Sequence, residues 1–229
     1  MTTDAYSVSQ TLPEKIAAAL AERVVTGMHQ PGERLVEAAL VKDFKVSHGP
    51  VRDALRILQN AGLVTIHPYR GAQVTGLTVR EVREIYQVRA ALVGLRARWI
   101  AEDPARGDLI AQVEAPVARL AELAKTPGTQ GQYITVALSI NRTLTESTSN
   151  RWLRSMLQAL TLQTSRYTRL ALASPERRRE SARLWRTLLA VLKAGDGERA
   201  QAVASTISLA TRDAAIRYLE ETNATTPQE

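Results

Sequence analysis

The chain has 229 residues, of which 45% are hydrophobic and 23% charged, with a net charge of +7 and no cysteine. This composition excludes a disulfide-stabilised scaffold and a cysteine-ligated metal site, and no apolar run reaches the ~18 residues of a membrane span. The first ten residues are polar and do not form a secretion signal, so we expect a cytoplasmic protein without a membrane partner.

The positive charge is distributed unevenly along the chain. Residues 1–75 carry eight Lys and Arg against seven Asp and Glu, whereas residues 76–229 carry 22 against 16. A basic protein suits a nucleic-acid partner, yet most of the excess lies in the second part. Two interpretations remain open: a solvated basic surface, or arginines that receive an anionic effector.

The first 75 residues predict three helices and a β-hairpin. Apolar residues recur every fourth position within 12–26, a second helix is expected over about 36–44, and Ser47 is a good N-cap for a third. Two strands, 63–66 and 72–75, flank the loop 67–71. Three helices followed by a hairpin are typical of a winged helix-turn-helix DNA-binding domain.

A set of short motifs runs through this part of the chain. They are Pro31-Gly32, Arg34-Leu35, Val46-Ser47, Pro50-Val51-Arg52, Ala54-Leu55, Gly62-Leu63-Val64 and Arg70-Gly71. In these motifs the chain resembles the DNA-binding domain of the GntR family of transcription regulators, over about a third of its length. The resemblance and the polar faces imply an interface with double-stranded operator DNA, formed by Arg34, Ser47, His48, Gly49, Arg52, Arg56, Tyr69, Arg70 and Gly71.

Two positions depart from the family pattern. His48 replaces the usual arginine after the serine, and Gly49 replaces a threonine. Histidine is shorter and mostly neutral at pH 7, so its DNA contact should be weaker or differently directed. The departure predicts either an altered operator or weaker DNA binding. For Arg52, the alternative to a DNA contact is an ion pair with Glu37 or Asp53 inside the domain.

The remaining residues predict helices alone. Thr78 and Glu81 form a capping box, which begins a helix that continues to about Ala101. Further helices are expected at about 105–125, 131–148, 150–173, 176–194 and 197–221. We therefore predict a mostly α protein: an N-terminal winged helix-turn-helix at 11–76, an all-α antiparallel helical bundle at 77–221, and flexible tails at 1–10 and 222–229.

The first helix of the bundle carries arginines within an apolar pattern. Ile85, Val88, Leu92, Leu95 and Trp99 define its apolar face. Arg89 and Arg96 fall on or beside that face, where burial requires a partner. The two arginines either extend to solvent or pair with carboxylates at a dimer contact, or one of them binds a ligand carboxylate.

Three landmarks connect the bundle to a family: Val82–Arg98, Leu144–Asn150 and Leu188–Ala200. In these the chain resembles the effector domain of the FCD branch of GntR regulators, the branch that includes a fatty-acid-responsive member. Many members bind a divalent metal there through an aspartate and three histidines. The resemblance places those ligand positions at Ala137, Asn141, Trp185 and Ile207, and residues 68–229 contain neither histidine nor cysteine. We therefore expect no metal and no cofactor.

Without a metal, an acidic ligand must be held by arginine, or the ligand must be less acidic. The substituted positions predict a largely apolar pocket for a small-molecule effector, either an organic acid or a more apolar metabolite. Our candidate effector residues are Arg89, Asn141, Thr164, Tyr167, Trp185 and Ile207. The alternative is that Trp185 and Ile207 fill the cavity and no effector binds.

No phosphate loop, nucleophile elbow, or catalytic His or Cys is present in the larger part, so we expect no enzyme activity. The sequence therefore predicts a homodimeric, sequence-specific transcription regulator, expected to be a repressor, whose affinity for DNA depends on a small metabolite bound in the helical domain. The alternative is a ligand-independent dimeric regulator with a filled, non-sensing helical domain.

Overall fold

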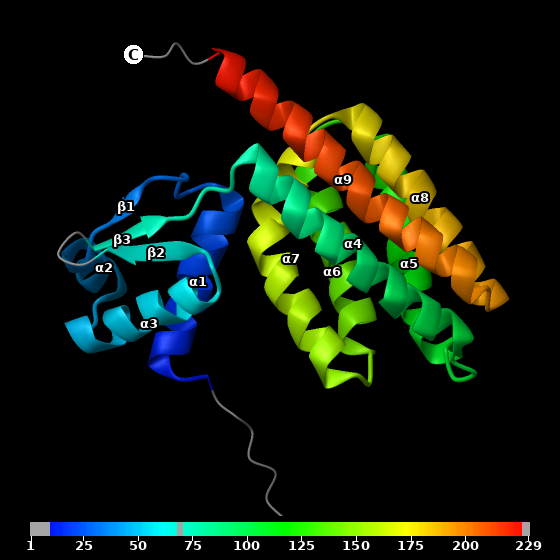
Figure 1. The fold of residues 1–229 in the computed structure, drawn as a ribbon, viewed down its shortest axis with the longest axis horizontal. Helices are drawn as coiled ribbons and strands as arrows, with labels where there is room; N and C mark the ends of the chain where they lie inside the picture. Colours follow the sequence, from blue (N-terminus) through cyan, green and yellow to red (C-terminus); the bar gives the residue numbers. More distant parts are fainter. Residues whose placement is uncertain (1–9, 68–70, 226–229) are drawn as a thin grey trace, which may run out of the picture. The chain divides into compact units, whose positions relative to one another are not determined.

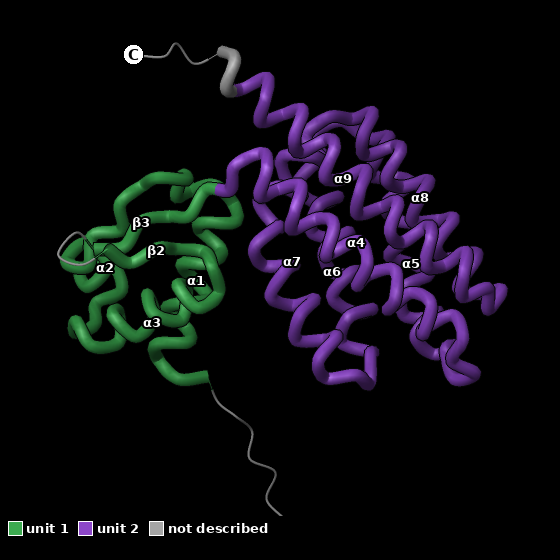
Figure 2. The backbone as a smooth tube through the Cα atoms, viewed as in Figure 1, with its two compact units in different colours: residues 1–76 green, residues 77–229 purple. Residues whose placement is uncertain are grey.

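The computed structural model describes residues 10–67 and 71–225, and the side chains of residues 223–225 are left out of the description. The chain divides into two compact units, Met1–Gly76 and Leu77–Glu229 (Figure 2). Both are mostly helical, as the sequence predicts. Within the described residues, no helix has the length and apolar character that crossing a bilayer requires.

The described residues of unit 1, 10–67 and 71–76, form three helices and a small sheet (Figure 1). Its elements are α1 (Leu12–Thr26), β1 (Arg34–Leu35), α2 (Glu37–Phe44), α3 (His48–Asn60), β2 (Val64–His67) and β3 (Gly71–Val74). Helix α1 begins with a capping box between Thr11 and Glu14, and it ends at Gly27, which adopts a left-handed conformation. The helices and the hairpin follow the predicted order.

The sheet has one more strand than the sequence predicts. Its order is β1-β3-β2 and all neighbours are antiparallel, with Leu35 opposite Ala72 and Val64 opposite Val74. Strand β1 is only two residues long, which is too short for an alternating pattern to reveal. Apolar side chains from α1, α3 and the sheet form the core of this unit: Ile16, Leu20, Val24, Leu35, Val51, Leu55, Leu58, Val64 and Val74.

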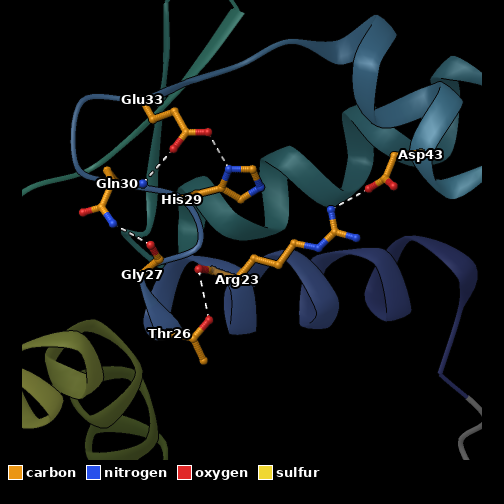
Figure 3. A network of polar contacts seen from close by, with 7 residues as sticks. All are labelled: Arg23, Thr26, Gly27, His29, Gln30, Glu33 and Asp43. Atoms are coloured by element: carbon orange, nitrogen blue, oxygen red, sulfur yellow. Dashed lines mark hydrogen bonds and ion pairs between the residues drawn. The ribbon is translucent and has the colours of Figure 1, made fainter.

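Polar contacts fix the loop between α1 and β1 (Figure 3). Nδ1 of His29 lies 2.6 Å from Oε1 of Glu33, and the backbone N–H of Gln30 donates to the same carboxylate. Arg23 on α1 forms an ion pair with Asp43 on α2. The ion pair connects α1 to α2, and the contacts of Glu33 hold the loop that leads into β1.

Unit 2 is a bundle of helices. Its elements are α4 (Val79–Glu102), α5 (Gly107–Leu123), α6 (Gln130–Glu146), α7 (Arg151–Ala171), α8 (Pro175–Ala194) and α9 (Gly197–Thr225). The predicted capping box is present, because Thr78 accepts from the N–H of Glu81 while Glu81 accepts from that of Thr78. Asn150 caps α7 and Ser174 caps α8.

The predicted apolar face of α4 is directed outward, away from the interior of the bundle. Val88 and Trp99 are exposed, while Ile85, Leu92 and Leu95 are only partly buried. The buried face is formed by other residues, which include Tyr86, Arg89, Val93, Gly94, Arg96 and Ala97. Small residues explain this orientation: a Cβ on Gly94 would lie 2.5 Å from Oγ of Ser205, so α9 packs closely there.

Candidate functional site

The N-terminus of α3 is an open, polar surface of unit 1. Ser47 occupies the N-cap position, as predicted, but its side chain makes no capping hydrogen bond. A Cβ on Gly49 would meet no atom within 4 Å. Ser47, His48 and Gly49 are all exposed. This end of the helix is therefore accessible, and its free N–H groups favour anions.

Two candidate DNA-contacting side chains share one carboxylate. The guanidinium Nε of Arg52 donates to both carboxylate oxygens of Glu37, at 2.9 and 3.1 Å, and Nδ1 of His48 lies 2.6 Å from Oε1 of the same group. The hydrogen bonds from Arg52 and then from His48 hold the pKa of Glu37 below its ordinary value. The alternative ion pair of Arg52 with Glu37 is thus present, yet 63% of the Arg52 side chain remains exposed.

The other candidate DNA contacts differ in their surroundings. Arg56 is 72% exposed and lies 3.5 Å from Asp53. Arg34 is exposed on β1, opposite Gln73. Gly71 begins β3 with a φ of +79°, a left-handed conformation that suits glycine. Tyr69 and Arg70 lie outside the described residues.

Unit 2 contains a cavity of about 50 Å³ between its helices. Residues from α4, α6, α7, α8 and α9, together with Leu172 directly after α7, line it: Arg89, Val93, Arg96, Ala137, Leu138, Asn141, Thr168, Leu172, Ser181, Trp185, Leu188, Ala204, Ile207, Ser208 and Thr211. Four candidate effector residues, Arg89, Asn141, Trp185 and Ile207, are therefore brought together. The polar residues Arg96, Thr168, Ser181, Ser208 and Thr211 also line it and are absent from our candidate set.

All four positions that hold metal ligands in other FCD proteins line this cavity. They are Ala137, Asn141, Trp185 and Ile207, and only Asn141 offers an oxygen. No cluster of three or more His, Cys, Asp or Glu residues with metal-binding geometry occurs in the part of the chain that the structure describes. The arginines beside Asn141 would repel a divalent cation. The residues present therefore do not fit the metal that the family resemblance implies.

Arg89 and Arg96 are buried, with exposed fractions of 8% and 2%. Nη1 of Arg96 donates to the backbone oxygen of Asn141, to its side-chain oxygen and to Oγ1 of Thr145, at 2.6–3.2 Å. Nη1 of Arg89 donates to Oγ of Ser208 at 3.3 Å, and its guanidinium carbon lies 5.8 Å from the ring centre of Tyr86. Every acceptor in this set is neutral.

Within the described residues of this one chain, neither Arg89 nor Arg96 pairs with a carboxylate, and Nε of each is buried without a hydrogen-bond partner. Pairing with a carboxylate of a second copy at a dimer contact stays a prediction. Burial lowers the pKa of Arg89, and burial together with the charge of Arg89 lowers the pKa of Arg96 to about 9. Arginine keeps its proton in proteins even when it is buried, so both guanidinium groups stay charged at neutral pH.

Two other buried arginines of this unit are compensated. Nη1 of Arg177 lies 3.5 Å from the carboxylate of Glu180, and its Nη2 donates to Thr211. Nη1 of Arg178 donates to the backbone oxygens of Leu172 and Ala173, which follow α7. The acceptors of Arg178 are carbonyl oxygens at the negative end of a helix, and Arg177 lies beside one carboxylate. Nε of both arginines is nevertheless buried without a hydrogen-bond partner, as it is in Arg89 and Arg96. Arg89 and Arg96 differ in that they line the cavity.

Thr164 and Tyr167, the other two candidate effector residues, do not line this cavity. Thr164 is fully buried, and its hydroxyl donates to the backbone oxygen of Leu160 within α7. The hydroxyl oxygen of Tyr167 accepts from the N–H of Leu77, 2.6 Å away, at the first residue of unit 2. Helical periodicity identifies an inward face, but it does not tell which inward residues border a void.

Family comparisons agree with the two-part organisation. Residues 12–74 match the model described as bacterial regulatory proteins of the gntR family, and residues 84–208, more than half of the chain, match the FCD domain. The chain belongs to the FCD branch of the GntR family. The two expected resemblances are thereby confirmed, and both matched families are regulators rather than enzymes.

Curated relatives of this GntR protein are transcriptional regulators. An uncharacterised HTH-type regulator of Bacillus subtilis, YdhC, is 29% identical over 61% of this chain and 62% of its own length. The gluconate operon repressor of the same organism is 38% identical over 34% of this chain and 32% of its own. The repressor GlaR of Escherichia coli is 30% identical over 40% of this chain and 46% of its own length. The chain thus spans less than two thirds of each of these relatives.

Solved structures share the whole fold of this GntR protein. McbR/YncC of E. coli has a TM-score of 0.78 at 21% identity and covers 93% of this chain and 100% of its own. A putative GntR regulator of Rhodococcus sp. RHA1 has a TM-score of 0.71 at 21% identity. The match covers 91% of this chain and 97% of the Rhodococcus chain. At this identity the likeness concerns the fold, an N-terminal winged helix followed by a helical bundle.

Proposed function

We propose that this protein is a homodimeric, sequence-specific DNA-binding repressor whose affinity for its operator is changed by a small molecule bound in the cavity of unit 2. One observation carries the proposal. The FCD bundle contains a partly open cavity lined by two arginines, hydroxyl groups and apolar side chains, in the same chain as a winged helix whose α3 begins with an exposed N-terminus. Repression is supported by the repressors among the relatives.

The DNA-binding part of the proposal rests on α3. His48, Arg52 and Arg56 lie on its exposed side, where an α-helix in the major groove presents its first turns to base edges. Glu37 orients Arg52 and His48 before DNA is bound. Phosphate oxygens can then compete for the same guanidinium, which is the usual source of affinity in protein–DNA contacts.

The dimer is supported by the outward apolar face of two packed helices. On α4, Val88 and Trp99 are 54% and 40% exposed, and on α7 Trp152 and Met156 are 64% and 52% exposed. Large apolar side chains exposed on two neighbouring helices are candidates for an interaction site. We assign this face to a second copy of the chain, since a two-fold axis would present two winged helices to a palindromic operator.

A second candidate function is a ligand-independent dimeric regulator. The small cavity favours it, because about 50 Å³ is far below the volume of pockets for drug-sized molecules, and Trp185 and Ile207 occupy the former ligand positions. In that case unit 2 serves dimerisation alone, and the amount of protein in the cell sets repression.

One experiment separates the two functions. A DNA duplex that the purified protein binds is first selected from a random library. The Kd of the protein for this duplex is then measured by fluorescence anisotropy, with and without the low-molecular-weight fraction of a bacterial extract. The proposal predicts a change in Kd of about five-fold or more, as is common for allosteric coupling. A Kd that stays constant with every extract fraction would support the ligand-independent regulator instead.

A further inference from the structure

The turn between α2 and α3 contains a strained backbone position. Lys45, directly after the last residue of α2, has a φ of 55° and a ψ of 45°, and it is the one non-glycine residue with a positive φ among residues 10–67 and 71–225. A Cβ disfavours this left-handed region, whereas glycine enters it freely. Helices α1 and α8 end in the same conformation at Gly27 and Gly195. Local structure alone therefore favours glycine at position 45 as well.

The backbone contacts of Lys45 do not explain the choice of lysine. Its N–H donates to the backbone oxygen of Val41, and the N–H of Val46 donates to the same oxygen at 3.2 Å. Glycine would make the first of these bonds equally well. The side chain is exposed, and no ion pair to it forms in the part of the chain that the structure describes. Strained positions of this kind gather at functional sites.

The neighbouring cations on α3 are placed differently. Each lies beside a carboxylate of the same unit: Arg52 and His48 beside Glu37, and Arg56 beside Asp53. A phosphate must compete with that carboxylate for each of them. Lys45 has no such competitor and lies two residues before Ser47, the N-cap of α3. It is therefore a cation beside α3 whose charge an anion can meet without breaking an ion pair.

We propose that Lys45 binds a phosphate of the operator backbone and thereby helps to fix α3 on the DNA. The inference rests on the DNA-binding part of the proposed function, and it adds a residue that is absent from our candidate interface. An ammonium is a compact charge on a flexible chain, which suits a phosphate oxygen. It supplies a permanent charge close to His48, whose ring is mostly neutral at pH 7.

Variants of the full-length protein separate the charge of Lys45 from its backbone. Lys45→Gly removes the charge and relieves the strain, whereas Lys45→Gln removes the charge and keeps the strain. Lys15→Gln is the matched control, because Lys15 is an exposed lysine of α1 that forms no ion pair within the described residues. Fluorescence anisotropy measures the Kd for the duplex selected with the parent and for a scrambled duplex, over a series of salt concentrations. Thermal unfolding gives the Tm of each variant.

Both Lys45 variants should bind DNA about three- to ten-fold more weakly at roughly 0.1 M salt, and the slope of log K against log salt should become less steep by about 0.9. The loss should be equal for the two duplexes, because a phosphate contact carries no sequence information. The Tm of Lys45→Gly should exceed that of the parent by about 2–5 °C. Lys45→Gln should gain no stability, and Lys15→Gln should keep the parent's slope.

The alternative role of Lys45 is structural, since a cation near the negative end of α2 interacts favourably with the helix dipole. Under that alternative, both Lys45 variants keep the Kd and the slope of the parent, which would overturn the inference. A loss confined to the selected duplex would make Lys45 a base contact, and an equal loss in Lys15→Gln would indicate a general effect of net charge. Either result also overturns it. If Lys45→Gly is less stable than the parent, the argument from strain fails and the Kd of Lys45→Gln decides.

The proposed function fails through different results. It is contradicted when the parent binds the selected and scrambled duplexes equally, or when no extract fraction changes its Kd. The phosphate contact is then still measured on the scrambled duplex, because its contribution does not depend on sequence. Conversely, an unchanged Kd in both Lys45 variants leaves the proposed function standing as long as the parent prefers the selected duplex.

Discussion

At the scale of single residues, the proposed DNA-binding surface of this GntR protein depends on the contacts of His48 and Arg52 with Glu37. His48 stands where the family has an arginine, and its ring shares Glu37 with Arg52. The carboxylate partly neutralises both groups. It also fixes their direction, so the surface presents ordered side chains rather than freely rotating ones.

Replacing His48 with arginine tests this surface. The variant His48→Arg should bind duplex DNA more tightly or prefer a different site, because a permanently charged, longer side chain with a bidentate fork replaces a short and mostly neutral ring. Parallel selection of binding sites for the variant and the parent measures both effects. Gly107→Ala in α5 of unit 2 is a suitable control, since an added Cβ there meets no atom within 4 Å and the residue lies outside the proposed DNA interface. Identical preferences and affinities for His48→Arg and the parent would place His48 outside the interface.

Trp185 decides how much of the cavity is filled. It is 7% exposed and packs in the main core of unit 2. The variant Trp185→Ala should lower the free energy of unfolding by about 3–5 kcal/mol and enlarge the cavity. Chemical denaturation measures the loss. A loss below about 1 kcal/mol would mean that the tryptophan does not fill the core.

At the scale of elements, α4 has two faces with separate roles. Its inner face holds Arg89 and Arg96 at the cavity, and its outer face carries the exposed residues Val88 and Trp99. The pattern in the sequence locates an apolar stripe on this helix, but it does not tell which side meets the bundle. Small residues such as Gly94 decide this, because they allow α9 to approach the opposite side.

The exposed apolar face of α4 predicts that a charged side chain placed on it weakens the proposed dimer. The variant Val88→Glu should convert the dimer to a monomer, since an unpaired carboxylate would be buried at the contact between two copies. Sedimentation equilibrium measures the mass, and circular dichroism checks that the helices persist. Gln87→Glu serves as a control that adds one carboxylate at an exposed position of the same helix. A Val88→Glu protein that remains dimeric would show that another face joins the copies.

The sequence predicts most elements because their signals are local. The capping box at Thr78 and Glu81, the N-cap Ser47 and the apolar periodicity within 12–26 each depend on neighbours in the chain. The DNA-binding residues follow from matched motifs. The cavity is harder to predict, because its lining comes from five helices and the residue that follows one of them. Family positions point to Asn141 and Trp185, which line the cavity, whereas periodicity alone points to Tyr167, which does not line it.

At the scale of the whole molecule, several carboxylates couple stability to pH. Hydrogen bonds lower the pKa of three glutamates. The main donor is His29 for Glu33, Arg52 for Glu37 and the backbone N–H of Thr78 for Glu81. Each folded-state pKa lies below the unfolded value, so the unfolded chain binds more protons on acidification. The stability that these groups contribute is present above about pH 4.5 and is lost as the pH falls through their folded pKa values.

The free energy of unfolding should therefore decrease when the pH is lowered from about 5 to about 3.5. Urea denaturation at each pH measures it. The variant Glu81→Gln keeps the capping geometry but has no titrating group, so it should lose less stability than the parent over the same interval. Constant or rising stability on acidification would contradict the assignment of these contacts.

The most direct test of a sequence-specific regulator is the affinity of the intact protein for DNA. Fluorescence anisotropy compares the selected duplex with a scrambled duplex of equal length, over a series of salt concentrations. We predict that the selected duplex binds about 10³-fold more tightly, and that Arg52→Ala makes the dependence of log K on log salt less steep by about one for each phosphate that the variant no longer binds. Equal affinity for the two duplexes would contradict the proposal of a sequence-specific regulator.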